Sequence, residues 1–214
     1  MAAAAPLIDE AGLLARLLAA NPVARQIVGI AGPPGSGKST VAERLVAAAN
    51  AARPGYAALL LKDGYHYDDG LLEAMGRCPR IGAPDTFDVG GGLAHTLARL
   101  RARDEAVVAV PVFDRSIEIA RAGARLIAQS ARLVVVEGNY LLLDAEDWAA
   151  LRAAFDLTVM IETPEARLRA RLTRRWQDLH LAPDEIAREV EQNDLLNGRR
   201  VIAPSQRPDL RLQT

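Results

Sequence analysis

Short apolar runs alternate along the chain with longer stretches whose apolar residues recur at helical spacing. The runs predict buried strands at 26–31, 56–61, 107–113, 133–136 and 156–161. The longer stretches predict helices at 9–20, 38–51, 69–75, 91–103, 146–154, about 163–180 and 183 to about 196. Because strands and helices alternate, we expect a mainly parallel sheet covered on both faces, which is a three-layer α/β/α fold.

Three segments do not follow this alternation. Residues 116–130 alternate like a strand, with Ala122-Gly123 as a turn that would make a short hairpin, but they also fit a helix. Residues 209–212 fit an edge strand. Residues 76–84 contain two glycines, two prolines and two arginines, which indicates an ordered loop over a site.

The segment between the first strand and the second helix carries the strongest motif of the chain. It fits the phosphate-binding pattern G-x-x-x-x-G-K-[ST], in which glycines let backbone N–H groups surround phosphate oxygens. Lys38 would reach the β- and γ-phosphates, and the Ser39 hydroxyl would hold Mg²⁺. The pattern therefore predicts a nucleoside triphosphate site formed by Gly32, Pro33, Pro34, Gly35, Ser36, Gly37, Lys38, Ser39 and Thr40.

Composition narrows the classes of partner. A chain of 214 residues fits one domain, 1–214, and its net charge of −1 argues against general affinity for nucleic acid or an anionic membrane. No apolar run reaches the roughly 18 residues that span a bilayer. The first residues lack the basic flank of a secretory signal, and the single cysteine excludes an internal disulfide. These features predict a cytoplasmic protein.

Two acidic residues follow predicted strands, where ligands bind in open α/β sheets. Asp63 comes directly after the second strand, beside Tyr65 and His66, and can accept a proton from an acceptor hydroxyl. The alternative is an aspartate that caps a helix or lies solvated in a loop. Glu137 ends a valine-rich strand and can reach the shell of a magnesium ion, with a structural cap as its alternative.

Two later segments carry further polar candidates. One predicted helix carries five arginines with no acidic residue from 166 to 177, which fits a lid over about 164–182 that closes on the transferred phosphate. Nucleic acid is the rival partner for this basic face. The arginines are Arg167, Arg169, Arg171, Arg174 and Arg175. The segment from Asn193 to Gly198 reads either as a helix C-terminus capped by Gly198 or as a ligand contact.

The order of these motifs resembles the uridine kinase, phosphoribulokinase and bacterial pantothenate kinase branch of the P-loop kinases. It is most similar to bacterial proteins labelled fructose-transport-system kinases or uridine-kinase-like proteins. The resemblance covers roughly residues 25 to 202. The residues that carry it are Gly32–Thr40, Lys62–Tyr67, Arg77–Arg80, Asp85–Asp88, Pro111–Asp114, Val136–Tyr140, the arginine helix and Asn193–Gly198.

The resemblance implies a P-loop NTPase fold with a helical arginine lid, Mg-ATP as donor and a small-molecule hydroxyl as acceptor. It implies Asp63 as the catalytic aspartate, Glu137 as the acid beside magnesium, and Arg171, Arg174 and Arg175 as lid arginines. Homodimers are common among such kinases, although no stretch of this sequence indicates an interface.

The acceptor itself stays open, because Glu118 stands where uridine kinases carry a histidine. A kinase of a nucleoside monophosphate and an ATP-binding regulator linked to transport are the alternatives. Strand ends and the loop facing the phosphates suggest acceptor contacts from Tyr65, His66, Arg80, Asp114 and Arg115.

Overall fold

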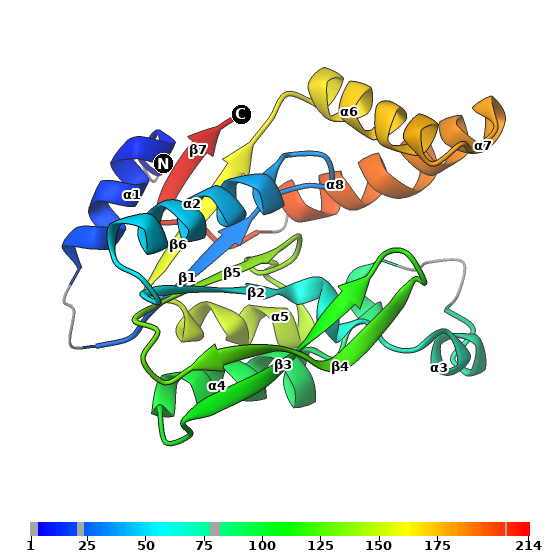
Figure 1. The fold of residues 1–214 in the computed structure, drawn as a ribbon. Helices are drawn as coiled ribbons and strands as arrows, with labels where there is room; N and C mark the ends of the chain where they lie inside the picture. Colours follow the sequence, from blue (N-terminus) through cyan, green and yellow to red (C-terminus); the bar gives the residue numbers. More distant parts are fainter. Residues whose placement is uncertain (1–3, 21–23, 78–81, 204) are drawn as a thin grey trace.

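The computed structural model describes residues 4–20, 24–77, 82–203 and 205–214. Within these residues, five strands form one parallel sheet with the order β2-β5-β1-β6-β7 (Figure 1). The strands are β1 (Gln26–Ala31), β2 (Ala57–Leu61), β5 (Leu133–Gly138), β6 (Leu157–Glu162) and β7 (Leu210–Gln213). The predicted parallel sheet is confirmed, and the C-terminal segment forms its edge strand.

Helices cover both faces of this sheet, as the three-layer prediction requires. α1 and α2 pack on the face that carries Val135, whereas α4 and α5 pack on the face that carries Val134. Adjacent residues of β5 thus enter opposite cores, because side chains alternate along a strand. The helices and short helical turns before β6 are α1 (Glu10–Ala19), α2 (Lys38–Ala52), η1 (Lys62–Tyr65), α3 (Asp69–Ala74), η3 (Pro84–Thr86), η4 (Val89–Ala94), α4 (His95–Ala102), α5 (Glu146–Ala150) and η5 (Leu151–Ala154).

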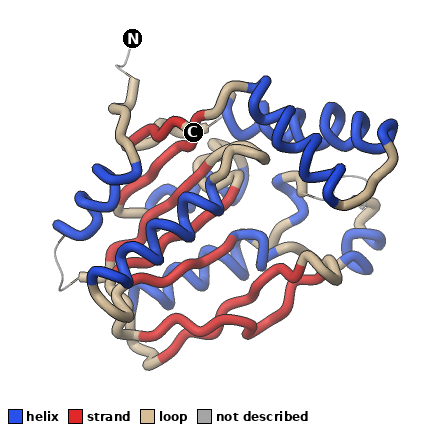
Figure 2. The backbone as a smooth tube through the Cα atoms, turned by 45° about the horizontal axis from the view of Figure 1, so that its top comes forward, coloured by secondary structure: helices blue, strands red, loops and turns tan. Residues whose placement is uncertain are grey.

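The segment that the sequence left ambiguous is a strand. β3 (Val107–Asp114) and β4 (Ile119–Ala128) form an antiparallel pair that is separate from the main sheet (Figure 2). The turn falls at residues 115–118, and not at Ala122-Gly123, which lies inside β4. Val108 and Ile127 enter the core, while Leu126 is 66% exposed, so this pair is buried on one face only. Burial on one face is typical of an antiparallel pair, whereas the strands of the parallel sheet are covered on both faces.

The last helices form a separate layer beyond the carboxyl ends of the strands (Figure 1). They are α6 (Glu165–Asp178), α7 (Pro183–Arg188), the π-helical turn η6 (Glu189–Asp194) and α8 (Leu195–Ile202), and a small apolar cluster that includes Leu172 and Val190 holds them together. The predicted cap at Gly198 is wrong, because α8 runs through this residue. A Cβ at Gly198 would lie 3.3 Å from Pro33 Cβ, so the glycine lets α8 approach the phosphate loop closely. Across the described residues, no helix is both long and apolar enough to cross a membrane.

Candidate active site

The strand order brings three polar loops to one edge of the sheet. β5 lies between β1 and β2, and Glu137 is in register with Ile30 on one side and with Leu61 on the other. Because the three strands are parallel and in register at these residues, the segments that follow them leave the sheet side by side. The phosphate loop after β1, the Glu137 end of β5 and the Lys62-Asp63 turn after β2 therefore meet at one place.

The phosphate loop has the backbone that its glycines allow. Gly35 and Gly37 have positive φ angles of 76° and 83°, which L-residues rarely adopt. Gly37 also caps α2, so the N-terminus of this helix faces the hollow of the loop. The buried Ser36 Oγ has no hydrogen-bond partner among the described residues. These features fit a bound triphosphate, whose oxygens would accept hydrogen bonds from this loop.

Lys38 and Glu137 form an ion pair beneath the loop. Lys38 Nζ lies 3.6 Å from Glu137 Oε1, and the Ser39 hydroxyl also lies against this carboxyl group. Burial raises the pKa of Glu137, while the positive charge of Lys38 opposes the rise. A hydroxyl and a carboxylate next to the phosphate position are oxygen ligands of the kind that hold Mg²⁺, either directly or through water.

Asp63 is held between two cations. Its Oδ1 atom lies 2.9 Å from Lys62 Nζ, and its Oδ2 atom accepts a hydrogen bond of 3.0 Å from Arg115. Burial alone would raise the pKa of Asp63, but the charges of Lys62, Lys38 and Arg115 outweigh burial and hold that pKa well below its usual range. Asp63 is therefore ionised at neutral pH, as an acceptor of a hydroxyl proton must be.

A cavity of about 370 Å³ joins the phosphate loop to Asp63. His66 lies in its wall with its ring centroid 3.9 Å from that of Phe87 and 5.3 Å from that of Phe113. Desolvation by burial and the charge of Lys62 lower the pKa of His66 to about 4, so its imidazole is neutral. The cavity thus presents a phosphate-binding side and a side lined with a carboxylate, a neutral imidazole and aromatic rings.

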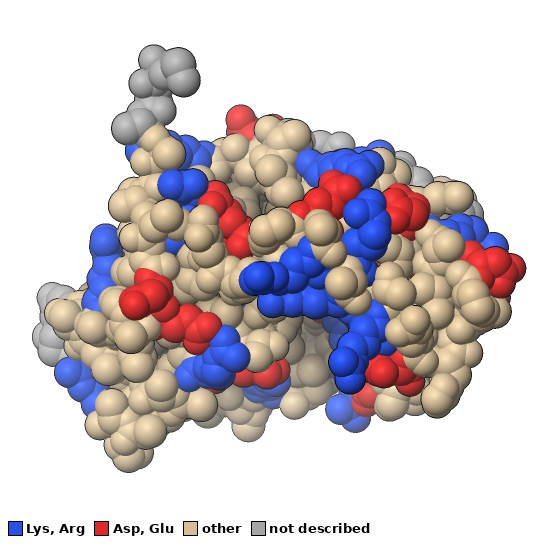
Figure 3. Space-filling view, turned by 90° about the horizontal axis from the view of Figure 1, so that it is seen from above, with Lys and Arg blue, Asp and Glu red and all other residues tan. Residues whose placement is uncertain are grey.

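The arginines of α6 divide into different roles. Arg171 donates hydrogen bonds to the carbonyl oxygens of Gly35 and Ser36 at 3.2 and 3.3 Å, and Arg175 lines the cavity. Arg174 is exposed, with no ion pair among the described residues. Arg169 pairs with Glu165 and Glu191, so acidic residues balance part of the basic face that the sequence suggested was unbalanced. Figure 3 shows Lys and Arg side chains gathered around a hollow, with acidic side chains beside several of them.

Comparison with known proteins identifies the family. A crystal structure of a candidate fructose transport system kinase from Silicibacter sp. TM1040 is 39% identical and has a TM-score of 0.86, over 95% of this chain and 98% of that one. The uncharacterized Escherichia coli protein YggC is 36% identical over 165 residues, which are 76% of this chain and 67% of YggC. The chain belongs to the uridine kinase, phosphoribulokinase and pantothenate kinase family of P-loop kinases.

Two further results bear on this placement. Phosphoribulokinase from Rhodobacter spheroides has a TM-score of 0.59 at 9% identity, over 88% of this chain and 70% of that one, which shows a shared fold alone. No protein-family model matches the chain.

The structure brings only some of the predicted acceptor contacts of this P-loop kinase into the cavity. His66 and Arg115 line it. Tyr65 is 6% exposed and lies in the core, where burial raises its pKa to about 12. Asp114 accepts hydrogen bonds from the Ser116 amide and hydroxyl and pairs with Arg121, which stabilises the hairpin turn. Arg80 lies outside the described residues.

Some residues that were not predicted line the cavity of the kinase, and so do polar side chains of the Asn193–Gly198 segment, for which a ligand contact was one of the two predicted alternatives. Lys62 lies directly behind Asp63, and Asn139 contributes a buried Oδ1 atom with no hydrogen-bond partner among the described residues. From the last helices come Trp176 and a set of polar side chains, Asn193, Asp194 and Asn197. Asp194 accepts a hydrogen bond of 2.8 Å from Trp176, and Asn197 donates one of 2.9 Å to Asn193. Asn139 could have been predicted from the sequence, because it follows Glu137 closely at the end of a buried strand.

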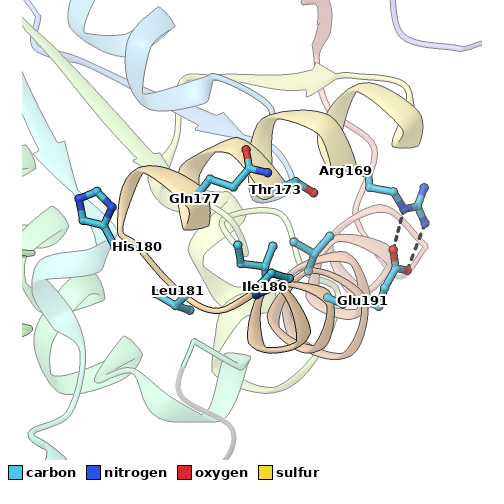
Figure 4. A pocket seen from close by; sticks show the side chains of 10 residues that line it. Arg169, Thr173, Gln177, His180, Leu181, Ile186 and Glu191 are labelled. Atoms are coloured by element: carbon cyan, nitrogen blue, oxygen red, sulfur yellow. Dashed lines mark hydrogen bonds and ion pairs between the residues drawn. The ribbon is translucent and has the colours of Figure 1, made fainter.

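A larger hollow of about 620 Å³ lies elsewhere, between α6 and the α7–η6 segment (Figure 4). Ile186 and Val190 line this hollow, and so do Arg169 and Glu191, whose ion pair Figure 4 marks. None of its lining residues belongs to the phosphate loop or to the ends of β2 and β5. The smaller cavity, which joins the phosphate loop to Asp63, is therefore the candidate active site of this kinase.

Proposed function

We propose that the protein transfers the γ-phosphoryl group of Mg-ATP to a hydroxyl group of a small-molecule acceptor. The observation that carries this proposal is the single cavity in which Lys38 of the phosphate loop and the ionised Asp63 both lie. A donor phosphate bound by the loop and an acceptor hydroxyl at Asp63 would share this space. In-line transfer needs that arrangement.

Each residue has a distinct part in the proposed reaction. Asp63 accepts a hydrogen bond from the acceptor hydroxyl and receives its proton as the phosphoryl group is transferred. Lys38 and the lid arginines Arg171 and Arg175 stabilise the charge on the phosphoryl oxygens. Ser39 and Glu137 would hold the magnesium ion, which neutralises charge between the β- and γ-phosphates when bound.

The charges around the acceptor side favour a neutral, hydroxyl-bearing acceptor. A hollow of about 410 Å³ adjoins the cavity, and its lining contains two arginines and two acids, namely Arg115, Arg175, Glu118 and Asp178. Because acids accompany both arginines, this wall has no surplus of positive charge for an acceptor phosphate. Nucleosides, sugars and vitamin-like alcohols are therefore favoured over nucleoside monophosphates as acceptors.

The test measures ADP release with Mg-ATP over a panel of nucleosides, sugars, pantothenate-like vitamins and nucleoside monophosphates. Wild type and Asp63→Asn are run side by side, and ATP binding is measured separately for each. We expect one acceptor class to stimulate turnover in wild type, and we expect the variant to lose this stimulation while still binding ATP. ATP binding without turnover on any acceptor would favour the regulator over the kinase.

A further inference from the structure

A buried lysine lies behind the catalytic aspartate. Lys62 is 1% exposed, although it is a charged residue directly after the buried strand β2. Its Nζ atom lies 2.9 Å from Asp63 Oδ1 and 3.4 Å from the centroid of the Phe87 ring, with the Tyr140 ring at 5.4 Å. Burying an ammonium group is unfavourable unless an anion and polarisable rings surround it. The fold supplies both.

The composition of the chain singles out this residue. Of its 26 basic residues, 24 are arginines and two are lysines. Both lysines, Lys38 and Lys62, line the same cavity. The phosphate-loop motif requires Lys38. Lys62 is therefore the remaining position at which this arginine-rich chain carries an ammonium group.

The packing explains why lysine occupies this position. A Cβ at Gly138 would lie 2.5 Å from Lys62 Cβ and 3.0 Å from its Cγ, so the lysine stem lies directly against the β5 backbone. An ammonium group is compact and can reach one carboxylate oxygen and one ring from this narrow space. A guanidinium group is a wide planar fork with five donors, and it would leave several of them unpaired here.

We propose that Lys62 is a positioning residue for Asp63, a role that rests on the kinase function proposed above. The buried ammonium holds Oδ1 toward the protein and thereby turns Oδ2 toward the cavity. There, Oδ2 contacts Arg115, whose side chain is 58% exposed and can give way to an acceptor hydroxyl. Asp63 thus keeps one permanent partner and exchanges the other during the reaction.

The surrounding charges agree with this role. Groups from each neighbouring element face the pair, namely Lys38 of α2, Glu137 of β5, Arg115 of the hairpin turn, His66 after η1 and Arg175 of α6. Burial lowers the pKa of Lys62, and the negative charge of Asp63 opposes that fall. Because the cations dominate around Asp63, its carboxylate is a weak base that orients the hydroxyl and takes the proton late.

A first test needs no acceptor. Lysine labelled with ¹³C at Cε gives only two side-chain signals in this chain, and Lys62→Met identifies the Lys62 signal by its loss. We expect Asp63→Asn to lower the pKa of Lys62 by at least about one pH unit, because the anion that stabilises the buried ammonium is gone. The Lys38 signal should shift less than the Lys62 signal, because the ion-pair partner of Lys38 is Glu137, at 3.6 Å. A Lys62 signal that titrates like an exposed lysine in both proteins would overturn the proposal.

A second test uses the acceptor that the panel identifies. We expect Lys62→Met to lower kcat at least tenfold, to leave the KM for ATP within about twofold, and to move the acid limb of the kcat–pH profile upward by about one pH unit or more. Arg115→Met removes the exposed partner of the same carboxylate, and we expect it to raise the acceptor KM instead. Wild-type kcat and an unchanged pH profile in Lys62→Met would overturn the proposal.

Thermal unfolding checks that these variants are folded. Removing one partner of a buried ion pair is destabilising, so we expect Lys62→Met to lower the Tm while keeping a single cooperative transition, and the kinetics are measured below that transition. Lys62→Arg tests the packing argument, because the wider group should fail to restore kcat. Should the panel reveal no acceptor, the kinase function fails, whereas the lysine titration still decides whether Lys62 holds Asp63.

Discussion

Gly64 marks the contact between the active-site turn and the β3–β4 hairpin, and Gly64→Ala tests how firmly this contact is set. An alanine Cβ at this position would lie 2.6 Å from the carbonyl oxygen of Pro111 and 2.8 Å from its carbonyl carbon. Real Cβ atoms essentially never approach within 3.0 Å of such neighbours, so the two backbones must separate by at least about 0.4 Å (3.0 − 2.6). No side chain can turn away to relieve this clash.

The expected effect on stability follows from that geometry. An added methyl group in a packed region costs about 1–3 kcal/mol. For a chain of this size, each kcal/mol corresponds to roughly 2–4 °C in Tm, so we expect Gly64→Ala to lower the Tm by roughly 2–12 °C. The shift also moves β3, which leads to Arg115. We therefore expect the acceptor KM to rise severalfold while ATP affinity stays within about twofold, because the clash lies away from the phosphate loop.

Urea unfolding measures the change, and Gly90→Ala is the matched control. Gly90 also has an ordinary φ, but the nearest atom to its added Cβ would be Asp147 Oδ2 at 4.0 Å. We expect this control to be neutral or to stabilise by about 0.4–1 kcal/mol, since alanine reduces the freedom of the unfolded chain. If both variants unfold within about 0.5 kcal/mol of wild type, the close backbone contact does not restrict position 64 and the reasoning is wrong.

Three further variants probe other parts of the molecule. Arg25 is 4% exposed and donates four hydrogen bonds of 2.7–3.0 Å to backbone carbonyls near α4 and the end of β4. Arg25→Ala should lower the free energy of unfolding by about 3 kcal/mol or more, and a loss under about 1 kcal/mol in urea would contradict this. For His66, the pKa falls from 6.5 to about 4 on folding, so its stabilising contribution is complete above about pH 6.5 and is lost as the pH falls toward 4. Between pH 7 and 5, wild type should lose roughly 1–2 kcal/mol more than His66→Asn, and equal losses would refute the assignment. Glu137→Gln should raise the Mg²⁺ concentration for half-maximal turnover about tenfold, whereas an unchanged Mg²⁺ dependence would remove Glu137 from the metal site.

The sequence predicts the parts of the fold that depend on local pattern. Apolar runs mark the buried strands, and the glycine–lysine spacing marks the phosphate loop together with the helix that follows it. The same local information does not determine how residues 116–130 fold, because their alternation fits a strand and their composition fits a helix. Contact with β3 and the core through Ile127 selects the strand.

Side-chain direction within short turns is harder to predict. Tyr65 and His66 are neighbours after the same strand, yet Tyr65 enters the core and His66 enters the cavity. The one-turn helix η1 determines which of the two side chains enters the core. Four residues are too few for a hydrophobic period that could predict this. Lys62 was missed for a related reason, since a lysine at the end of an apolar run usually marks the point where a strand reaches solvent.

The strand order explains why the donor half of the site is predictable and the acceptor half is not. With β5 between β1 and β2, Glu137 lies between the phosphate loop and Asp63, so three strand ends place these groups in a row. Each of these positions carries a motif that can be recognised along the chain. The wall on the proposed acceptor side instead comes from the hairpin turn and from the helices after β6, which lie outside the sheet and reach the cavity only through tertiary packing. Substitutions there can change the acceptor without disturbing the row of strand ends, and the acceptor is therefore the property that a resemblance in motifs constrains least.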